Sequence, residues 1–511
     1  MKQFIRLTIA ISVMACIMPS CKKDLLNVDN PNTITEEQFW KTEADAEKGI
    51  NAAYAMFYKP GGWARWIYFR LDLTSDEGCS KSPWIELADW TRFQYVNYNF
   101  WEGNAITWRD TYKAVFRCNQ VLANVPDIPF TDNSKKDLIL AQAKFLRGLH
   151  YYYAAIMWEN IPLVLEPSKP DDLPQQYPLA EVWTQVEKDF TEALAVLPVQ
   201  WDDGNVGRPT KGAANAFLAR TFMQQHKWQQ AKTALDYFFT GAGSGKYDLM
   251  PNFQDNFVHT SENNKESVFE IQFSDVNKGG DGDDPNQNMG SHRAQFFAPR
   301  GIGWSDGQAR YWLVNEFKKE KTASNSLDPR LRYSLFYPAL QADFGDKVYG
   351  RNWEWNNDEA WFRKYQRDYF RTNEDYFSQD NFRMVRFSDV LLMYAETLNE
   401  LDQTITAAKY VDSVRARVNM TPLAMAHPDA LLSKDAFRER LKTERVLELC
   451  GESVRWADLK RWGDLETQTK VNLVAQRDPD FNNFVVGKHI RLPIPQTEVL
   501  NNPNLDQNDK Y

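Results

Sequence analysis

Apolar residues recur at helical spacing in several long stretches of the chain. In residues 138–159 they fall three or four positions apart, which places on one helix face Leu138, Ala141, Phe145, Leu149 and Tyr152. Residues 36–58 and 108–125 show the same texture, and Trp108 is expected in the core. The pattern predicts a chain built mostly from amphipathic helices.

Two stretches read as pairs of helices separated by a short break. Residues 211–239 are predicted to form two helices with a break at 225–227. Residues 387–418 repeat this organisation, with Arg386 and Asp389 opening the first helix of the pair. Such pairs resemble tetratricopeptide units, which cannot bury their apolar faces alone and are expected to stack.

Two regions lack this periodicity. Residues 59–107 and 241–382 are rich in Gly, Asn, Asp, Trp and Tyr, and long aperiodic stretches in a compact chain are usually functional loops or linkers. Residues 266–273 are the exception, because their alternation predicts a short β-strand. The predicted fold class is mostly α: tetratricopeptide-like helix pairs form a scaffold, with long irregular loops and a few short β-strands.

The amino terminus reads as an export signal. Lys2 and Arg6 form a basic start, and the apolar stretch over 7–18 is shorter than the roughly 20 residues that span a bilayer. The predicted signal peptide covers residues 1–20, which leaves a cysteine as the first residue of the mature chain.

We predict that Cys21 is acylated, as in a bacterial lipoprotein. The polar stretch over 21–35 would then serve as a tether, and several acyl chains would make the anchor effectively permanent. Two alternatives stay open, because Met18-Pro19-Ser20 departs from the usual lipobox. They are acylation at Cys16 and ordinary secretion with a free cysteine.

Composition excludes several other classes of protein. Charged residues make up 25% of the chain and are spread evenly, as in a globular protein. The net charge is −9, and removal of two basic residues with the leader makes it −11, so we predict no nucleic-acid partner. Cys79, Cys118 and Cys450 are too few for a disulfide framework, although one bridge stays open.

No catalytic or cofactor motif is found. "GAGSGK" at 241–246 lacks the spacing and the Ser or Thr of a phosphate loop, so a turn after a helix is predicted. We predict no cofactor. "DGDD" offers Asp281, Asp283 and Asp284 to a structural calcium ion, but the order of an EF-hand is missing and a solvated loop is favoured.

A glycosidase would need two carboxylates held across a cleft. Glu444, Glu448 and Glu452 instead follow one helix face at four-residue steps, bordered by arginines. This arrangement favours a structural charge network, and we predict that the protein is not an enzyme.

Several stretches resemble the SusD/RagB family of outer-membrane nutrient-binding lipoproteins. They occur in family order and cover nearly the whole mature chain: "NPNTITEEQFW" (30–40), "AKFLRGLHYYYAAIMWENIPLV" (143–164), "GRPTKGAANAFLAR" (207–220), "VRFSDVLLMYAETLNE" (385–400), "VRARV" (414–418), "ERVLELCGESVRWADLKRWG" (444–463) and "LPIPQTEVLNNPNLDQN" (492–508). The resemblance implies an N-terminal SusD-like helical region over 36–265 and a C-terminal SusD/RagB region over 266–511.

The resemblance also implies a function. Members sit on the surface of Bacteroidota, anchored in the outer membrane by lipid such as palmitate. They cap a SusC-like TonB-dependent transporter and pass it oligosaccharides or, in some members, peptides. A different class stays open as the alternative: a tetratricopeptide-type protein-interaction adaptor without a small ligand.

Candidate ligand contacts come from the two irregular regions, where Trp residues stand among Gly, Asn, Asp and Arg. Sugar rings stack on aromatic planes, and their hydroxyls need polar partners. The predicted contacts are Trp84, Trp90, Trp101, Asn104, Arg70 and Asp76 in the first region, and Trp304, Asp306, Trp353 and Trp355 in the second. For any single Trp, packing of the loop against the scaffold is the competing interpretation.

The lipoprotein hypothesis predicts the behaviour of one variant. Cys21→Ala removes the thiol that would be acylated, so the protein should leave the membrane fraction. Fractionation after a high-salt wash measures this. A variant that still sediments with outer membranes would mean that Cys16 is the site or that the anchor is not a lipid.

Overall fold

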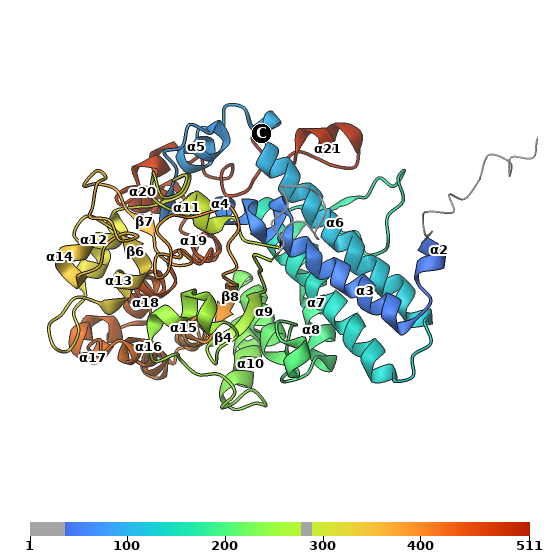
Figure 1. Ribbon diagram of the computed structural model, residues 1–511, viewed down its shortest axis with the longest axis horizontal. Helices are drawn as coiled ribbons and strands as arrows, with labels where there is room; N and C mark the ends of the chain where they lie inside the picture. Colours follow the sequence, from blue (N-terminus) through green and yellow to red (C-terminus); the bar gives the residue numbers. More distant parts are fainter. Residues whose placement is uncertain (1–35, 277–288) are drawn as a thin grey trace, which may run out of the picture.

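The amino-terminal part of the chain forms long helices that pack side by side. In the computed structural model, which describes residues 36–276 and 289–511, α3, α6, α7 and α8 lie together on the right of Figure 1, and α9 and α10 lie nearer its centre. Helix α7 packs against both α6 and α8, and α3 packs against α6. The helices of this part are α2 (Glu36–Phe39), α3 (Glu43–Tyr54), α6 (Glu102–Asn124), α7 (Asn133–Trp158), α8 (Leu179–Val196), α9 (Lys211–Gln224) and α10 (Trp228–Phe239).

Local sequence signals explain where these helices begin and how closely they approach. Thr42 and Asp45 form a capping box at the start of α3, and the side chain of Thr210 caps α9. A Cβ at Gly148 of α7 would lie 3.1 Å from the Asp189 side chain on α8, so glycine permits this close contact. The predicted break between α9 and α10 is confirmed at residues 225–227.

The carboxy-terminal part repeats the helix-pair organisation. Helices α15 and α16 form the predicted second pair, and α15 also packs against α18 and α10. The predicted strand is confirmed as β4 (Ser267–Ile271), which runs antiparallel to β8 (Phe382–Arg386) with Ser267 opposite Arg386. The helices of this part are α15 (Phe387–Glu400), α16 (Thr404–Arg417), α17 (Leu423–Ala426), α18 (Lys434–Leu449), α19 (Arg455–Arg461), α20 (Gln468–Ala475) and α21 (Gln496–Asn501).

The two regions predicted to be irregular contain short helices that the sequence did not indicate. Every residue of α4 is buried, so its sequence carries no alternation between apolar and polar faces. These helices are α4 (Trp66–Leu73), α5 (Ile85–Arg92), α11 (Arg293–Phe297), α12 (Trp312–Lys319), α13 (Pro329–Ser334) and α14 (Leu340–Phe344). A π turn at Pro60–Ala64 precedes α4.

Short strand pairs and single helical turns connect these elements. Strand β1 (Gly78–Cys79) pairs with β5 (Gln308–Ala309) and thereby joins the two irregular regions. The other pairs are β2 (Ile161–Pro162) with β3 (Gln176–Tyr177), and β6 (Leu335–Phe336) with β7 (Trp361–Phe362). Turns of 3-10 helix lie at Ala55–Tyr58, Tyr98–Phe100, Val125–Asp127, Asp203–Asn205, Phe253–Phe257, His259–Ser261, Pro428–Leu431 and Pro479–Asn483. The mostly α fold with few short strands is confirmed.

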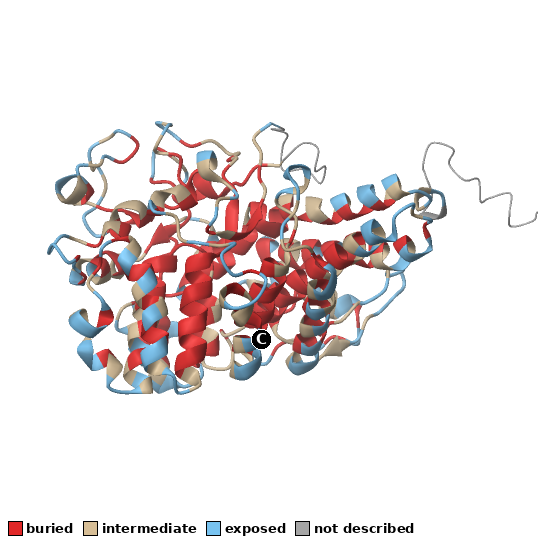
Figure 2. Cartoon of the chain, turned by 90° about the horizontal axis from the view of Figure 1, so that it is seen from below, coloured by how far each residue is buried: buried red, intermediate tan, exposed pale blue. Residues whose placement is uncertain are grey.

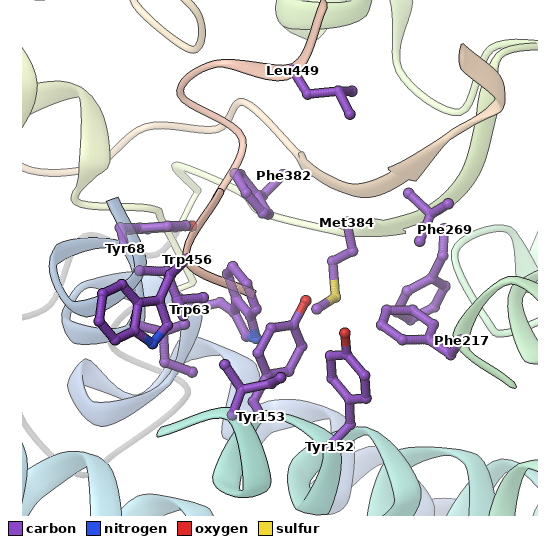
Figure 3. Close-up of a cluster of buried hydrophobic side chains, with 14 of the residues drawn as sticks. Trp63, Tyr68, Tyr152, Tyr153, Phe217, Phe269, Phe382, Met384, Leu449 and Trp456 are labelled. Atoms are coloured by element: carbon purple, nitrogen blue, oxygen red, sulfur yellow. The ribbon is translucent and has the colours of Figure 1, made fainter. Parts of the chain in front are cut away.

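An aromatic core joins the amino-terminal helices to the carboxy-terminal part. Buried residues follow the inner faces of the helices (Figure 2). In Figure 3, Tyr152 and Tyr153 rise from α7 towards strand β8. Trp63 stacks on Phe382 of β8, with 5.0 Å between ring centroids. Trp108 is buried, as predicted.

The three glutamates at four-residue steps form a buried charge network, which confirms the structural interpretation. Glu444 accepts hydrogen bonds from Arg330 and Arg415 at 2.7 Å each. Glu448 accepts from Arg417, and Glu452 accepts from Arg386. These carboxylates are occupied by arginines, so they offer no free pair for glycoside hydrolysis.

Other sequence features have simple outcomes. "GAGSGK" forms a turn after α10, as predicted. Cys79, Cys118 and Cys450 are buried free thiols, so the one disulfide that the sequence left open does not form among them. Within the described ranges, no helix is long and apolar enough to cross a bilayer, and no group of metal-ligating side chains is found. Cys21 and the "DGDD" segment lie outside the described residues.

The charge network predicts a loss of stability in acid. Despite burial, the neighbouring arginines, Arg417 first, lower the pKa of Glu448 to about 2. Its contribution to the free energy of unfolding is therefore complete above the unfolded-state pKa near 4.5 and is lost as the pH falls towards about 2. Glu448→Gln leaves buried guanidinium groups without their charge partner and should cost about 3–5 kcal/mol at pH 7.

Urea denaturation at pH 7 and pH 3 measures both effects. Glu439→Gln, at an exposed position on the same helix, is the matched control and should stay within about 0.5 kcal/mol of the unchanged protein. Equal losses in the two variants would contradict the assigned role of Glu448.

Candidate functional site

Aromatic side chains from the two irregular regions meet at one place on the protein. We call this place the aromatic surface and define it by Arg65, Trp84, Trp304 and Tyr376, which lie over Trp66 and Phe296. Trp304 packs edge-on against Phe296 at 4.8 Å and lies 5.6 Å from Tyr376. On the other side, Trp84 packs against Trp66 at 4.9 Å.

Arg65 connects the two halves of the aromatic surface. Its guanidinium carbon lies 5.4 Å from the ring centre of Trp66 and 6.0 Å from that of Phe296. One guanidinium nitrogen donates to the hydroxyl of Tyr376 at 3.2 Å. The pairing of β1 with β5 holds the two irregular regions together nearby. Arg65 therefore places a charged hydrogen-bond donor among the rings.

The backbone around Trp304 explains why this side chain is exposed. The Trp304 amide donates to the carbonyl of Gln295 at 2.8 Å. A Cβ at Gly303 would lie 2.4 Å from that same carbonyl oxygen, so only glycine fits there. The tight turn directs Trp304 outward, with 53% of its surface accessible. An exposed indole held by a fixed backbone can receive a flat ligand.

Trp353 and Trp355 form a second aromatic group beside the same turn. Their rings lie 5.2 Å apart, and both pack against the buried Trp361. The Trp355 indole donates to the carbonyl of Arg300 at 3.0 Å, and that of Trp361 donates to the Ser305 hydroxyl at 2.9 Å. Both predicted residues are half-buried and brace the turn that carries Trp304.

Two carboxyl groups near the Trp304 turn already have hydrogen-bond partners. Glu359 accepts two hydrogen bonds from Arg300, at 2.8 and 2.7 Å, and these bonds lower its pKa. Asp306 is buried, which raises its pKa, and Ser82 donates to it. The predicted residue Asp306 therefore lies beneath the surface rather than on it.

The expectation that the Trp residues of the first region lie outside the core is wrong for two of them. Trp90 is 1% exposed and Trp101 is 4% exposed. Trp90 packs edge-on against both Trp66 and Trp101, and the Trp101 indole donates to Asp89. Neither ring has a free face on which a sugar could stack.

Three polar residues predicted as ligand contacts are also buried. Asp76 holds salt bridges to Arg455 and Arg477. Asn104 donates to the Pro493 carbonyl at 3.0 Å and accepts from the indole of Trp158, on α7. Arg70 is 1% exposed. These side chains are enclosed by the carboxy-terminal part of the chain, whose position the local sequence does not reveal.

Sequence reasoning missed Arg65, Tyr376, Trp66 and Phe296. Tyr376 stands in a polar stretch, "RTNEDYF", like those that contain the predicted Trp residues. A tyrosine in such surroundings is therefore a usable signal for this surface. Contact between ligand and Trp84, Trp304, Trp353 or Trp355 stays a prediction.

Two cavities lie elsewhere, on either side of Val206–Arg208. Their volumes are about 530 and 290 Å³. In the larger one, Arg208 already donates to Gln142 and Glu47, and the Tyr54 hydroxyl also donates to Gln142. Because these polar groups satisfy one another, the aromatic surface is the stronger candidate.

Comparison with protein families gives two matches along the chain. Residues 265–511 match a family model described as "SusD family". Residues 24–223 match one described as "Starch-binding associating with outer membrane". Among curated relatives, SusD-like protein P38 from Formosa agariphila is 26% identical over 541 residues, with all of both chains covered. SusD-like protein P25 from the same organism is 26% identical and covers 96% of this chain and 95% of its own.

Solved structures give the same fold. A SusD superfamily protein from Bacteroides vulgatus superposes with a TM-score of 0.81 at 24% identity, covering 93% of this chain and all of that one. A laminarin-binding SusD-like protein has a TM-score of 0.73 at 26% identity, covering 92% and 100%. Surface glycan-binding protein A from Bacteroides thetaiotaomicron, in complex with laminarihexaose, has a TM-score of 0.72 at 22% identity, covering 92% and 100%.

The placement of the Trp residues predicts two different effects on stability. Trp90→Ala empties a buried site and should lower the free energy of unfolding by about 3–5 kcal/mol. Trp304→Ala should change it by less than about 1 kcal/mol, because half of its surface already faces solvent. Urea denaturation of both variants measures the difference, and similar losses would show that Trp304 belongs to the core.

Proposed function

The chain belongs to the SusD family, and from this premise we propose that it captures an oligosaccharide on the aromatic surface. The family comprises SusD-like starch- and glycan-binding surface proteins. The observation that supports the location is the half-exposed indole of Trp304, with the Tyr376 ring and the Arg65 guanidinium beside it.

The chemistry of the aromatic surface suits a sugar. A pyranose ring presents C–H groups on its faces, which pack on an indole, and hydroxyls on its rim, which require hydrogen-bond partners. The Tyr376 ring lies beside the Trp304 ring, and the Tyr376 hydroxyl and the Arg65 guanidinium that donates to it are the polar groups of this surface. Ring and donors are held by the fold before ligand arrives, which reduces the entropic cost of binding.

The proposal includes binding without cleavage. A glycosidase needs one protonated and one ionised carboxyl group on either side of the scissile bond. Near the Trp304 turn, Glu359 is held in a salt bridge by Arg300 and Asp306 is buried. Glu374 and Asp375, next to Tyr376, both pair with Arg367. We therefore assign the aromatic surface to capture alone.

We also propose where the captured sugar goes. The leader and Cys21 support a lipid anchor in the outer membrane, where the protein would cap a SusC-like TonB-dependent transporter and pass the sugar to it. One structural neighbour is a laminarin-binding protein and another is in complex with laminarihexaose, so a β-glucan is the first ligand to test. A peptide, as in other members of the family, is the second.

Trp304→Ala tests the site. Removal of the stacking ring should weaken binding of laminarin oligosaccharide tenfold or more, which corresponds to about 1.4 kcal/mol or more. The matched control is Phe370→Ala. That ring is similarly exposed, at 51%, but its ring contacts are with His259 and Tyr369 and not with the rings of the aromatic surface.

Calorimetric titration against a panel of laminarin, starch and peptide, with a thermal melt of each sample, gives the result. The control should bind like the unchanged protein, and all melting temperatures should agree within a few degrees. Binding of a sugar that neither variant affects would reject the aromatic surface. A panel without any bound sugar would reject the proposed ligand class.

A further inference from the structure

Arg70, predicted as a ligand contact, poses a physical problem in the interior. It lies on α4 and is 1% exposed. Across residues 36–276 and 289–511, none of its three side-chain nitrogens has a hydrogen-bond acceptor. Its guanidinium carbon lies 4.5 Å from the ring centre of Trp456, which covers one face of the group. The N–H groups along the edge of the guanidinium therefore still lack hydrogen-bond acceptors within these ranges.

The other fully buried arginines show how the fold normally treats such a group. Each of the five is in a salt bridge with at least one carboxylate: Arg330 with Asp328 and Glu444, Arg367 with Glu374, Arg383 with Glu270, Arg386 with Glu448 and Glu452, and Arg415 with Glu444. Arg70 differs from all of them. A buried charge that lacks a partner is strongly unfavourable.

Carboxylates on the helices around α4 are committed elsewhere. On α5, Glu86 accepts from the amides of Gly103 and Asn104, and Asp89 accepts from the Trp101 indole. On α6, Asp110 accepts from Arg109 and the Gly61 amide. On α19, Asp458 pairs with Arg445 and Arg461. None of them reaches Arg70.

The electrostatics around Arg70 are those of an uncompensated cation. Burial lowers the pKa of Arg70, and the groups that oppose this effect are the phenols of Tyr95 and Tyr511. Arg70 in turn contributes to lowering the pKa values of His489 and Lys460, after burial. Lys460 already pairs with Glu159.

Several buried polar groups around Arg70 also lack hydrogen-bond partners among the described residues. In the described part of the chain, the Tyr95 hydroxyl and the indole N–H groups of Trp66, Trp90 and Trp456 also have no hydrogen-bond acceptor. Trp66 and Trp90 are in ring contact, and Trp101 connects Trp90 to Tyr95. A water molecule there could donate only to the Tyr95 oxygen and would leave the buried positive charge of Arg70 uncompensated. A group that only accepts hydrogen bonds suits this environment.

We propose that Arg70 and Tyr95 form an internal binding site for a small inorganic anion of single charge, such as chloride. The anion would accept from the guanidinium edge and from the phenol, and it would neutralise the buried positive charge. A small ion is required because both the guanidinium and the hydroxyl are closed to solvent. Arg70 and Tyr95 are not part of the aromatic surface, although Trp66 borders both sites, and the proposal does not depend on which sugar is bound.

Tyr95→Phe is the central variant, because it removes one O–H donor and leaves the charge and the ring in place. Thermal melts of the mature chain at constant ionic strength, with chloride replaced stepwise by gluconate, measure the effect. The melting temperature should fall by about 3 °C or more without chloride and recover with bromide. In Tyr95→Phe the halide concentration for half recovery should rise about tenfold.

Tyr98→Phe is the matched control, since Tyr98 belongs to the same aromatic group and contacts Trp101 and Tyr511. It should respond to halide like the unchanged protein. Arg70→Met removes the charge itself and should abolish the halide dependence. If Arg70→Met does not fold, Tyr95→Phe decides the question alone.

Crystals grown in bromide give an independent result. An anomalous peak at hydrogen-bonding distance from the Arg70 guanidinium supports the site. Water alone at that position overturns the proposal. Bromide in the crystal without any halide dependence of the melting temperature also overturns it, because the ion would then be adventitious.

Discussion

The guanidinium of Arg386 holds together parts of the chain that are far apart in sequence. Arg386 ends strand β8 and precedes α15. It donates to Glu266 beside β4 at 2.5 Å, to Glu448 on α18 at 3.0 Å and to Glu452 at 2.7 Å. Lys364, from the second irregular region, also donates to Glu452 at 2.7 Å. The network therefore fixes the strand pair, the helix pair and the region that carries the aromatic surface in one arrangement.

The sequence could predict the helix pairs, but it could not predict the buried helix α4 or the buried polar residues around it. Helix α10 was predictable because it has one buried face, so its apolar residues recur with a helical period. Helix α9 is buried on nearly all sides, and its run of alanines, which favour helix, made it predictable. Helix α4 was not predictable, because all of its residues are buried and the period disappears. Asp76 looks like a loop carboxylate locally, but its partner Arg455 lies 379 positions away. Contacts at that separation leave no trace in local composition.

The candidate site shows the same limit on a smaller scale. Trp90 and Trp304 stand in similar polar stretches, yet the first packs against the rings of Trp66 and Trp101 and the second is turned outward by the backbone at Gly303. Composition located the two regions that form the aromatic surface. It could not tell which indole supports the surface and which one presents a face to ligand, because that depends on how the two regions pack.

The separation between Asp76 and its partners also constrains the order in which the chain can fold. Its carboxylate is buried between Arg455 and Arg477, so a growing chain that has not reached residue 477 cannot satisfy it. The last residues are needed as well, since Asn508 donates to the carbonyl of Trp158 at the end of α7. Such long loops are slow to close. The amino-terminal part therefore gains these contacts only when synthesis of the chain is nearly complete.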